Sequence, residues 1–575
     1  MPPPNPQPLI GPLLQKLQQV VAANPARAGL PAAVLTAVLD EGIAFAHERF
    51  RVGNGTRIEY FWNQNGSAGP PPPGLFGTEL SATTINAATP DEDQVYRTLG
   101  ELSFANPGYK AIAHRRSHGT HVLDLAAGDD PATAPLARPI IAIEMPQQAI
   151  ANTSGTTLTP YKLLGFLYTL LRAQQMSTAL GGNVPVVISL SYGGYEGAHD
   201  GSGPLESMID QLTVLCTGSA TPVRFVIAAG NHRQARVHAH FRIARRRPRT
   251  LNWRLQPDDR TSNLLQIWLP ESAHRKNLNQ FQVRVMVTSP TGGSISVDLA
   301  NPAAAQPGPL GVEFSASYVS ETPTQRAHID IHTEATAPAI PLDRTQPMAP
   351  PGVWLVKISH VAGAPFDCDA YIQRDETLRG RPAMGRQSYF DDPNYPRHER
   401  LEIPGNRSGR PKEFDRPPPT CDVKRTGTLN GDGTGVESYV IGGYRRTPKP
   451  WNRYTPAPDN PMPTASTSEG PLAANAKRTM PSPNWLMPAD DSLSCRGVLA
   501  AGTRSGVRVA MGGTSVAAPQ AARYVADQLA IGNVPGTAPP PGLFPIASKV
   551  PVNDRPLVAG SGCLDFPPSQ TRGRP

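Results

Sequence analysis

Apolar positions in the first 231 residues follow two alternating patterns. Short continuous apolar runs, typical of strands buried on both faces, are separated by longer stretches in which apolar residues recur every three or four positions. Strands are expected at 33–40, 139–144, 184–190 and 223–229, and helices at 161–176 and 205–215. Because strands that alternate with helices form parallel sheets, this pattern predicts an α/β fold with a doubly wound parallel sheet.

The pattern changes after residue 231. Strand-like runs now follow one another without helices between them and are separated by Pro, Gly and Asn turns, at 264–269, 281–287, 294–299, 312–317, 328–332, 353–358 and 368–373. Such a succession is typical of an all-β sandwich or jelly roll. The parallel-sheet pattern returns at 436–443, and a helix with one apolar face begins at Ser515. The β-rich module is therefore predicted to be inserted into the α/β domain.

These changes divide the chain into five segments. They are 1–30, an N-terminal extension; 31–231, the first part of the α/β domain; 232–435, the inserted β-rich module with proline-rich loops; 436–535, the second part of the α/β domain; and 536–575, a proline-rich C-terminal tail. The extension has an amphipathic stretch over 13–21, spaced for a short helix. A strand or hairpin arm is expected at 58–62, and a loop at 70–74.

Three residues suited to nucleophilic catalysis stand far apart, in the order Asp40, His118, Ser515. Ser515 follows two glycines and opens a helix, whose positive end favours an anion on an attacked carbonyl. A serine nucleophile needs a base within hydrogen-bond reach, and the base needs a carboxylate to orient it. Asp40 ends a predicted buried strand, at the edge of a parallel sheet where ligands bind.

Each of these residues also has a simpler interpretation. A serine after two glycines is often a helix N-cap, and Asp40 alone could belong to a turn. His114, His118 and His121 are spaced for a metal ion, but no Cys or carboxylate stands close enough in sequence to complete a site. His121 is expected to be a buried structural histidine on the helix of His118. The joint occurrence of all three residue types favours catalysis.

Five stretches resemble the motifs of the subtilisin family of serine peptidases, the subtilases. They are 38–43 around Asp40, 118–122 around His118, 513–519 around Ser515, and the strand-like runs 188–194 and 225–231. Val516 stands where methionine is usual in the family. The chain order of the three catalytic types is also the subtilisin order. The resemblance covers about 31–231 and 436–535, and it does not extend to the β-rich module.

The resemblance implies a role for each matching residue. Asp40 orients His118, which takes the proton of Ser515 while the serine oxygen attacks the peptide carbonyl. The backbone N–H of Ser515 and the side-chain amide of Asn231 form the oxyanion hole. The substrate backbone pairs with one strand edge. The substrate-binding residues are Ser191, Tyr192, Gly193 and Gly230.

We therefore expect a serine endopeptidase that acts on proteins or peptides through an acyl-enzyme. The alternative is a catalytically silent peptide-binding or recruitment protein of the same fold, in which the β-rich module binds a protein partner. Gly193 is expected to leave room for a substrate side chain. No cofactor is required; structural calcium is common in the family, but the sequence locates no site, and 430–435 is expected to be a tight turn.

Composition and charge indicate which kinds of partner to expect. The 575 residues carry a net charge of +8, mostly from scattered arginines, and only 242–249 is densely basic. This run is interpreted as an exposed loop, so no nucleic-acid partner is expected. No membrane contact is expected, because no apolar run is long enough to cross a bilayer.

The N-terminal sequence and the cysteines predict a cytoplasmic location. Residues 1–6 lack the features of a secretory signal, and the five cysteines are odd in number and far apart, which suits a reducing compartment. Residues 7–12 are apolar and contain two prolines, so they are expected to be extended. One hypothesis places this segment in the substrate groove; an idle terminus is the alternative.

Overall fold

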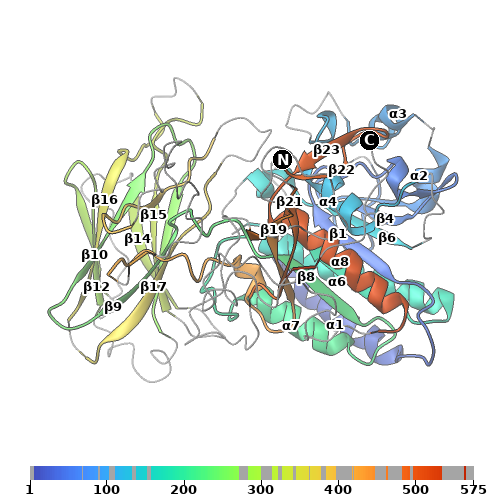
Figure 1. Cartoon of the computed structure of the whole chain (residues 1–575), viewed down its shortest axis with the longest axis horizontal. Helices are drawn as coiled ribbons and strands as arrows, with labels where there is room; N and C mark the ends of the chain where they lie inside the picture. The colour runs from blue at the N-terminus through green and yellow to red at the C-terminus, as the bar shows by residue number, and fades with distance from the viewer. Residues whose placement is uncertain are drawn as a thin grey trace, which may run out of the picture.

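The computed structural model describes residues 6–67, 69–88, 91–102, 111–131, 138–151, 157–270, 283–298, 314–320, 327–340, 345–361, 363–376, 384–395, 417–418, 420–446, 462–463, 482–491, 496–533 and 563–564. These residues form a mostly parallel α/β part and a part made of antiparallel sheets, which lie side by side (Figure 1).

The large sheet carries the candidate site. Its order is β20 (Met462–Pro463), β19 (Tyr439–Arg445), β8 (Val223–Ala228), β7 (Val186–Leu190), β1 (Leu35–Asp40), β6 (Ile140–Glu144), β4 (Ile58–Asn63) and β5 (Thr78–Ser81), with β21 (Trp485–Asp490) also paired to β19. Strands β1, β4, β6, β7, β8 and β19 lie at the predicted apolar runs, whereas β5, β20 and β21 were not predicted. Only β4–β5 and β19–β20 pair antiparallel. The predicted parallel α/β sheet is therefore confirmed.

Helices cover both faces of this sheet because the side chains of β1 alternate between two cores. Leu35, Ala37 and Leu39 pack under α1 (Gln7–Ala23), α6 (Thr159–Leu180) and α7 (Pro204–Cys216). Val34 and Val38 belong to the clusters under α4 (His118–Ala127) and α8 (Thr514–Ala530). Asp40 has the same parity as Val38, so its side chain lies on the face of α4.

Smaller elements surround this sheet. They are η1 (Glu48–Phe50), β2 (Arg51–Val52), β3 (Gly55–Thr56), α2 (Ala82–Ala87), α3 (Glu92–Thr98), η2 (Ala111–Ala113), α5 (Gln147–Ala151), η5 (Gly431–Gly433), β22 (Val498–Ala501) and β23 (Arg508–Met511). The tail expected at 536–575 lies outside the described residues except for 563–564, where Cys563 forms a parallel bridge to Leu486 and Leu564 is buried.

Two five-stranded antiparallel sheets form the other part of the molecule (Figure 1). One has the order β13 (Ser294–Asp298), β12 (Val283–Thr288), β16 (Gly352–His360), β10 (Arg249–Leu255), β18 (Tyr389–Phe390). The other has the order β14 (Phe314–Ser320), β15 (Ala327–Thr333), β11 (Asn263–Trp268), β17 (Phe366–Ile372), β9 (His238–Ile243). One buried apolar cluster contains side chains from both sheets, including Trp253, Trp354 and Trp268.

The sequence did not predict β9 and β10. The basic run 242–249 is not one exposed loop: Arg242 and Ile243 end β9, Arg249 begins β10, and only residues 244–248 form the connection. Arg242 pairs with Asp367 on the neighbouring strand β17 at 3.0 Å. Alternating buried positions on these strands, such as Phe241 and Ile243, were obscured by the arginines.

The expectation that residues 7–12 are extended is wrong. They form the first turns of α1, and Ile10, Leu13 and Leu17 are buried against the core under α6 and α7. Pro8 lies in the first turn, where its missing N–H costs no intrahelical bond, and the helix tolerates Pro12 because its apolar face is buried. The segment is therefore not available to occupy a substrate groove.

Candidate active site

Asp40 and His118 meet where β1 ends and α4 begins. Asp40 is the last residue of β1 and is fully buried, and His118 is the first residue of α4. Asp40 Oδ1 lies 2.7 Å from His118 Nδ1, and the backbone N–H of Glu41 donates to the same carboxylate oxygen at 2.8 Å. The acceptor at Nδ1 favours the tautomer with its proton there, which leaves Nε2 able to accept a proton.

The small residues beside His118 allow α4 to approach the end of β1 closely. The Gly119 N–H donates to Glu41 O at 2.8 Å, and a Cβ at Gly119 would lie 2.3 Å from that oxygen. The hydroxyl groups of Ser117 and Thr120 both donate to Gly42 O. The sequence His118-Gly119-Thr120 thus has a packing reason as well as a chemical one.

The charges around His118 come from both parts of the molecule. Burial lowers the pKa of His118, but the charge and hydrogen bond of Asp40 outweigh burial, so the pKa is raised above its usual 6.5. The positive charge of Arg374, which follows β17 in the antiparallel part, acts in the opposite direction and lowers it. No pattern in the sequence indicates that the charge of Arg374 acts on this histidine.

His121 lies one turn further along α4 and is fully buried. Its Nε2 lies 2.9 Å from Val498 O, and burial lowers the pKa of His121 to about 4, so the ring is neutral at ordinary pH. This matches the expectation of a structural histidine. Within the described part of the chain, no group of three or more His, Cys, Asp or Glu residues could hold a metal ion.

Ser515 is in the first turn of α8, whose N-cap is Gly513. The N–H groups of Val516 and Ala517 both donate to Gly513 O, whereas the first-turn N–H of Ser515 has no intrahelical partner. The Ser515 side chain is partly exposed. Among the described residues, its hydroxyl group makes no hydrogen bond with His118 or any other group.

Asn231 lies against the same helix terminus. The Thr514 N–H donates to Asn231 Oδ1 at 3.1 Å, and the Gly230 N–H donates to Thr514 Oγ1 at 3.0 Å. Gly230 has a φ of +100°, a region open to glycine, and this turn directs Asn231 toward α8. With Oδ1 turned to Thr514, the Nδ2 group of Asn231 lies against Gly513, the N-cap of α8, where a Cβ would be 3.3 Å from it.

Of the predicted substrate-binding residues, Ser191, Tyr192 and Gly193 follow β7 and Gly230 follows β8, at the same edge of the sheet. The Tyr192 ring stands edge-on to the His118 ring, with centroids 6.3 Å apart, and its hydroxyl donates to Ile150 O at 3.1 Å. Within the described part of the chain, the backbone groups of Ser191 and Gly193 pair with no other backbone group. The expected open space at Gly193, however, is filled: the side chain of Asn430 lies there, because a turn from a distant segment packs against it.

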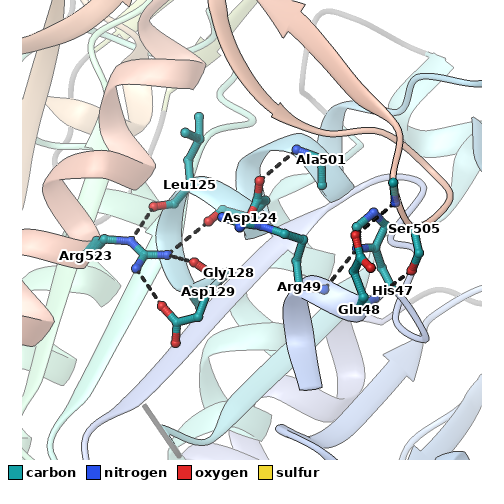
Figure 2. Close-up of polar contacts among 12 residues, drawn as sticks. His47, Glu48, Arg49, Asp124, Leu125, Gly128, Asp129, Ala501, Ser505 and Arg523 are labelled. Atoms are coloured by element: carbon teal, nitrogen blue, oxygen red, sulfur yellow. Dashed lines mark hydrogen bonds and ion pairs between the residues drawn. The ribbon is translucent and has the colours of Figure 1, made fainter. Parts of the chain in front are cut away.

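Polar contacts tie the helix of His118 to the helix of Ser515 (Figure 2). Arg523 on α8 reaches the end of α4, where its guanidinium donates to the carbonyl oxygens of Leu125 at 3.0 Å and Asp124 at 3.1 Å, and to that of Gly128. It also pairs with Asp129 at 3.1 Å. A cation at a helix C-terminus is favoured by the helix dipole.

Asp124 links α4 to two neighbouring elements, η1 and β22 (Figure 2). Its carboxylate accepts from Arg49 Nε at 2.6 Å and from the Ala501 N–H at 2.7 Å. Burial alone would raise the pKa of Asp124, but Arg49 and the Ala501 N–H lower it, so the carboxylate is ionised. The sequence analysis did not single out Asp124 or Arg523. For Asp124 the available signal was a carboxylate within a helix of otherwise mostly apolar residues, which indicates a buried partner of opposite charge.

Together, the fold and this geometry define an α/β protein with an acid–histidine pair and a helix-borne serine at the carboxyl edge of a parallel sheet. The model of the subtilase family, a family of peptidases, matches residues 32–302 and so confirms, over that range, the resemblance carried by the motifs. No curated protein matches the chain.

Several chains of known structure have a similar fold. One of them is the CspB protease of Clostridium perfringens, with a TM-score of 0.61, 18% sequence identity, and coverage of 93% of this chain and 94% of that one. At this identity the similarity concerns the fold. Within the described residues, none of the helices has both the length and the apolar character needed to cross a bilayer.

Proposed function

We propose that this chain is a serine endopeptidase with the triad Asp40, His118 and Ser515. The observation that carries the proposal is the 2.7 Å contact between Asp40 and His118 at the sheet edge where α8 presents Ser515. Asn231 beside the α8 terminus supports its assignment as an oxyanion donor. The subtilase match over residues 32–302 supports a peptidase that acts on proteins or peptides.

Each step of the proposed reaction uses groups of this chain. His118 Nε2 accepts the proton of Ser515 Oγ as that oxygen attacks the peptide carbonyl, and the Asp40 carboxylate stabilises the imidazolium. The Ser515 N–H and Asn231 Nδ2 donate to the oxyanion. His118 then protonates the leaving amine, and water hydrolyses the acyl-enzyme. In free enzymes, catalytic hydrogen bonds such as the one proposed between His118 and Ser515 are often long or poorly aligned. They become short and well aligned only when substrate binds.

We further propose that the antiparallel sheets form an inserted β-sandwich module. The backbone of 238–240 pairs with 422–424: the His240 N–H donates to Asp422 O at 2.8 Å and the Lys424 N–H to His238 O at 2.9 Å. The chain therefore leaves and returns at neighbouring points. The structure of the CspB protease covers 93% of this chain. The uncovered residues are too few to make up the whole of 232–435, so the match includes part of this segment.

The decisive test is labelling with a fluorophosphonate probe together with turnover of a peptide library. We expect wild-type protein to be labelled and Ser515→Ala to be neither labelled nor active, with an unchanged melting temperature because the side chain is small and partly exposed. Asn231→Ala should lower kcat by about 10²–10³. Absence of labelling in folded wild-type protein would instead favour the catalytically silent peptide-binding alternative.

A further inference from the structure

The turn around η5 lies between the two segments that are predicted to bind substrate, one after β7 and the other after β8. The Asn430 N–H donates to Ala229 O at 2.7 Å, beside Asn231, and the Gly431 N–H donates to Gly194 O at 3.1 Å, beside the predicted substrate-pairing edge. A substrate that pairs with 191–193 and presents its carbonyl to Asn231 places the preceding side chain between these segments. The turn therefore lies where that side chain has to fit.

The side chain of Asn430 takes up the space over Gly193. A Cβ built on Gly193 would lie 1.4 Å from Asn430 Nδ2, so the amide is packed directly against that glycine. Asn430 Nδ2 also donates to Ala228 O at 3.3 Å, and the residue is only 4% exposed. The amide thus spans the gap from one segment to the other.

Several buried contacts prevent this turn from moving aside. Lys162 Nζ pairs with Asp432 Oδ2 at 2.6 Å, with side-chain exposures of 0% and 3%. Thr434 Oγ1 donates to Gly431 O at 2.8 Å, and the Gly201 N–H lies 3.1 Å from Thr434 Oγ1. Breaking a buried ion pair by removing one partner is strongly unfavourable. A large substrate side chain would therefore meet a fixed obstacle.

We propose that Asn430 restricts the residue on the amino side of the cleaved bond to small side chains, namely Gly, Ala or Ser. This inference rests on the proposed function and names its substrate class. A hydrophobic pocket discriminates one methylene by about 10- to 200-fold, and a side chain of Leu or Phe adds several carbon atoms beyond Ala.

The test compares peptides that differ only at this position, with Gly, Ala, Ser, Leu or Phe. For wild-type enzyme we expect kcat/KM after Ala to exceed that after Leu or Phe by more than about tenfold. Asn430→Ser keeps an oxygen able to accept from the Asp432 N–H, as Asn430 Oδ1 does at 3.2 Å, and should bring the ratio toward one. Asn430→Ala is the second variant, and Asn252→Ala on β10 is the matched control.

A binding measurement separates this inference from the proposed function. Ser515→Ala protein is titrated calorimetrically with the same peptides, so that selectivity is measured without turnover. Tighter binding of the Ala than of the Leu or Phe peptide, lost in Ser515→Ala/Asn430→Ser, supports the inference even if no peptide is cleaved. Equal cleavage or equal affinity for Ala and Leu peptides in the protein with Asn430 intact would overturn it.

Discussion

At the scale of single residues, the Asp40–His118 pair shows how burial and charge compete. Asp40 is fully buried, His118 is 26% exposed, and their 2.7 Å contact raises the pKa of His118 although burial lowers it. The charge of Arg374 acts in the opposite direction and lowers this pKa. The pKa of the base therefore depends on an anion of the parallel sheet and on a cation that follows β17.

This balance predicts the pH dependence of activity. The base acts only when neutral, so kcat/KM should fall as pH decreases through the pKa of His118, which lies above 6.5. Arg374→Gln removes the charge that lowers this pKa, so the acidic limb should move to higher pH while the plateau is retained. The measurement is kcat/KM against pH for both proteins.

Arg284→Gln, at an exposed position of strand β12, is the control for this experiment. It changes the net charge equally but is not among the groups that act on His118. An acidic limb that stays in place in Arg374→Gln, or moves equally in both variants, would contradict the assigned electrostatics.

At the scale of elements, the relation between α4 and α8 decides how the base meets the nucleophile. Each helix presents its residue from its N-terminal turn, and the two helices pack against each other. Arg523 of α8 donates hydrogen bonds to the last carbonyl groups of α4 (Figure 2). These bonds hold the C-terminal end of α4, the end away from His118, against α8. A small rotation of one helix would move His118 relative to Ser515.

Replacing Arg523 should therefore impair catalysis as well as stability. For Arg523→Ala we expect a loss on the order of 2 kcal/mol in unfolding free energy, since hydrogen bonds to charged groups are worth about 1.5–3 kcal/mol. We also expect kcat to fall about tenfold with KM little changed, because a misplaced base affects the reaction and not substrate binding. Arg523→Lys should recover part of both losses.

The comparison variant is Arg138→Ala, which removes a more exposed pair with Asp527 on the same helix. Exposed pairs contribute about 0–1 kcal/mol, so this variant should keep nearly full stability and kcat. A loss of stability in Arg523→Ala with kcat unchanged would show that Arg523 has no part in positioning.

At the scale of the whole molecule, the two parts share a junction beside the candidate site. The Tyr371 ring of β17 stacks on His199 at 4.1 Å and on His238 at 4.6 Å, and Tyr195 packs against His232, the residue after Asn231. Arg374 follows the same strand. The antiparallel sheets therefore come close to the candidate site, where they can affect access by large substrates.

Replacing 241–421 with a short Gly/Ser linker tests this arrangement. The joined ends already pair with each other, and the Asn430 turn remains anchored to Ala229 and Gly194. We expect the variant to keep fluorophosphonate labelling and cleavage of small peptides but to lose preference among long or folded substrates. An unchanged cleavage profile on long substrates would show that these sheets have no role in selection.

The sequence by itself determined the parallel sheet and the positions of the three motif residues. Apolar runs of fixed period specify buried strands and helices locally, and Asp40, His118 and Ser515 each stand at the end of such an element. The proline-containing α1 was misjudged because burial of Ile10, Leu13 and Leu17 outweighed local propensity. Strands β9 and β10 were missed for another reason: their arginines interrupt the alternation of apolar and polar positions by which a strand is predicted.

Tertiary structure alone decided what surrounds the site. Asn430, Arg374 and Arg523 are distant in sequence from the residues that they contact or whose pKa they change, and no local pattern marks them. Their contacts depend on which loops and helix ends meet at one edge of the sheet. Chain periodicity fixes the elements, but only their packing sets the distances, charges and free space on which pKa values and substrate selection depend.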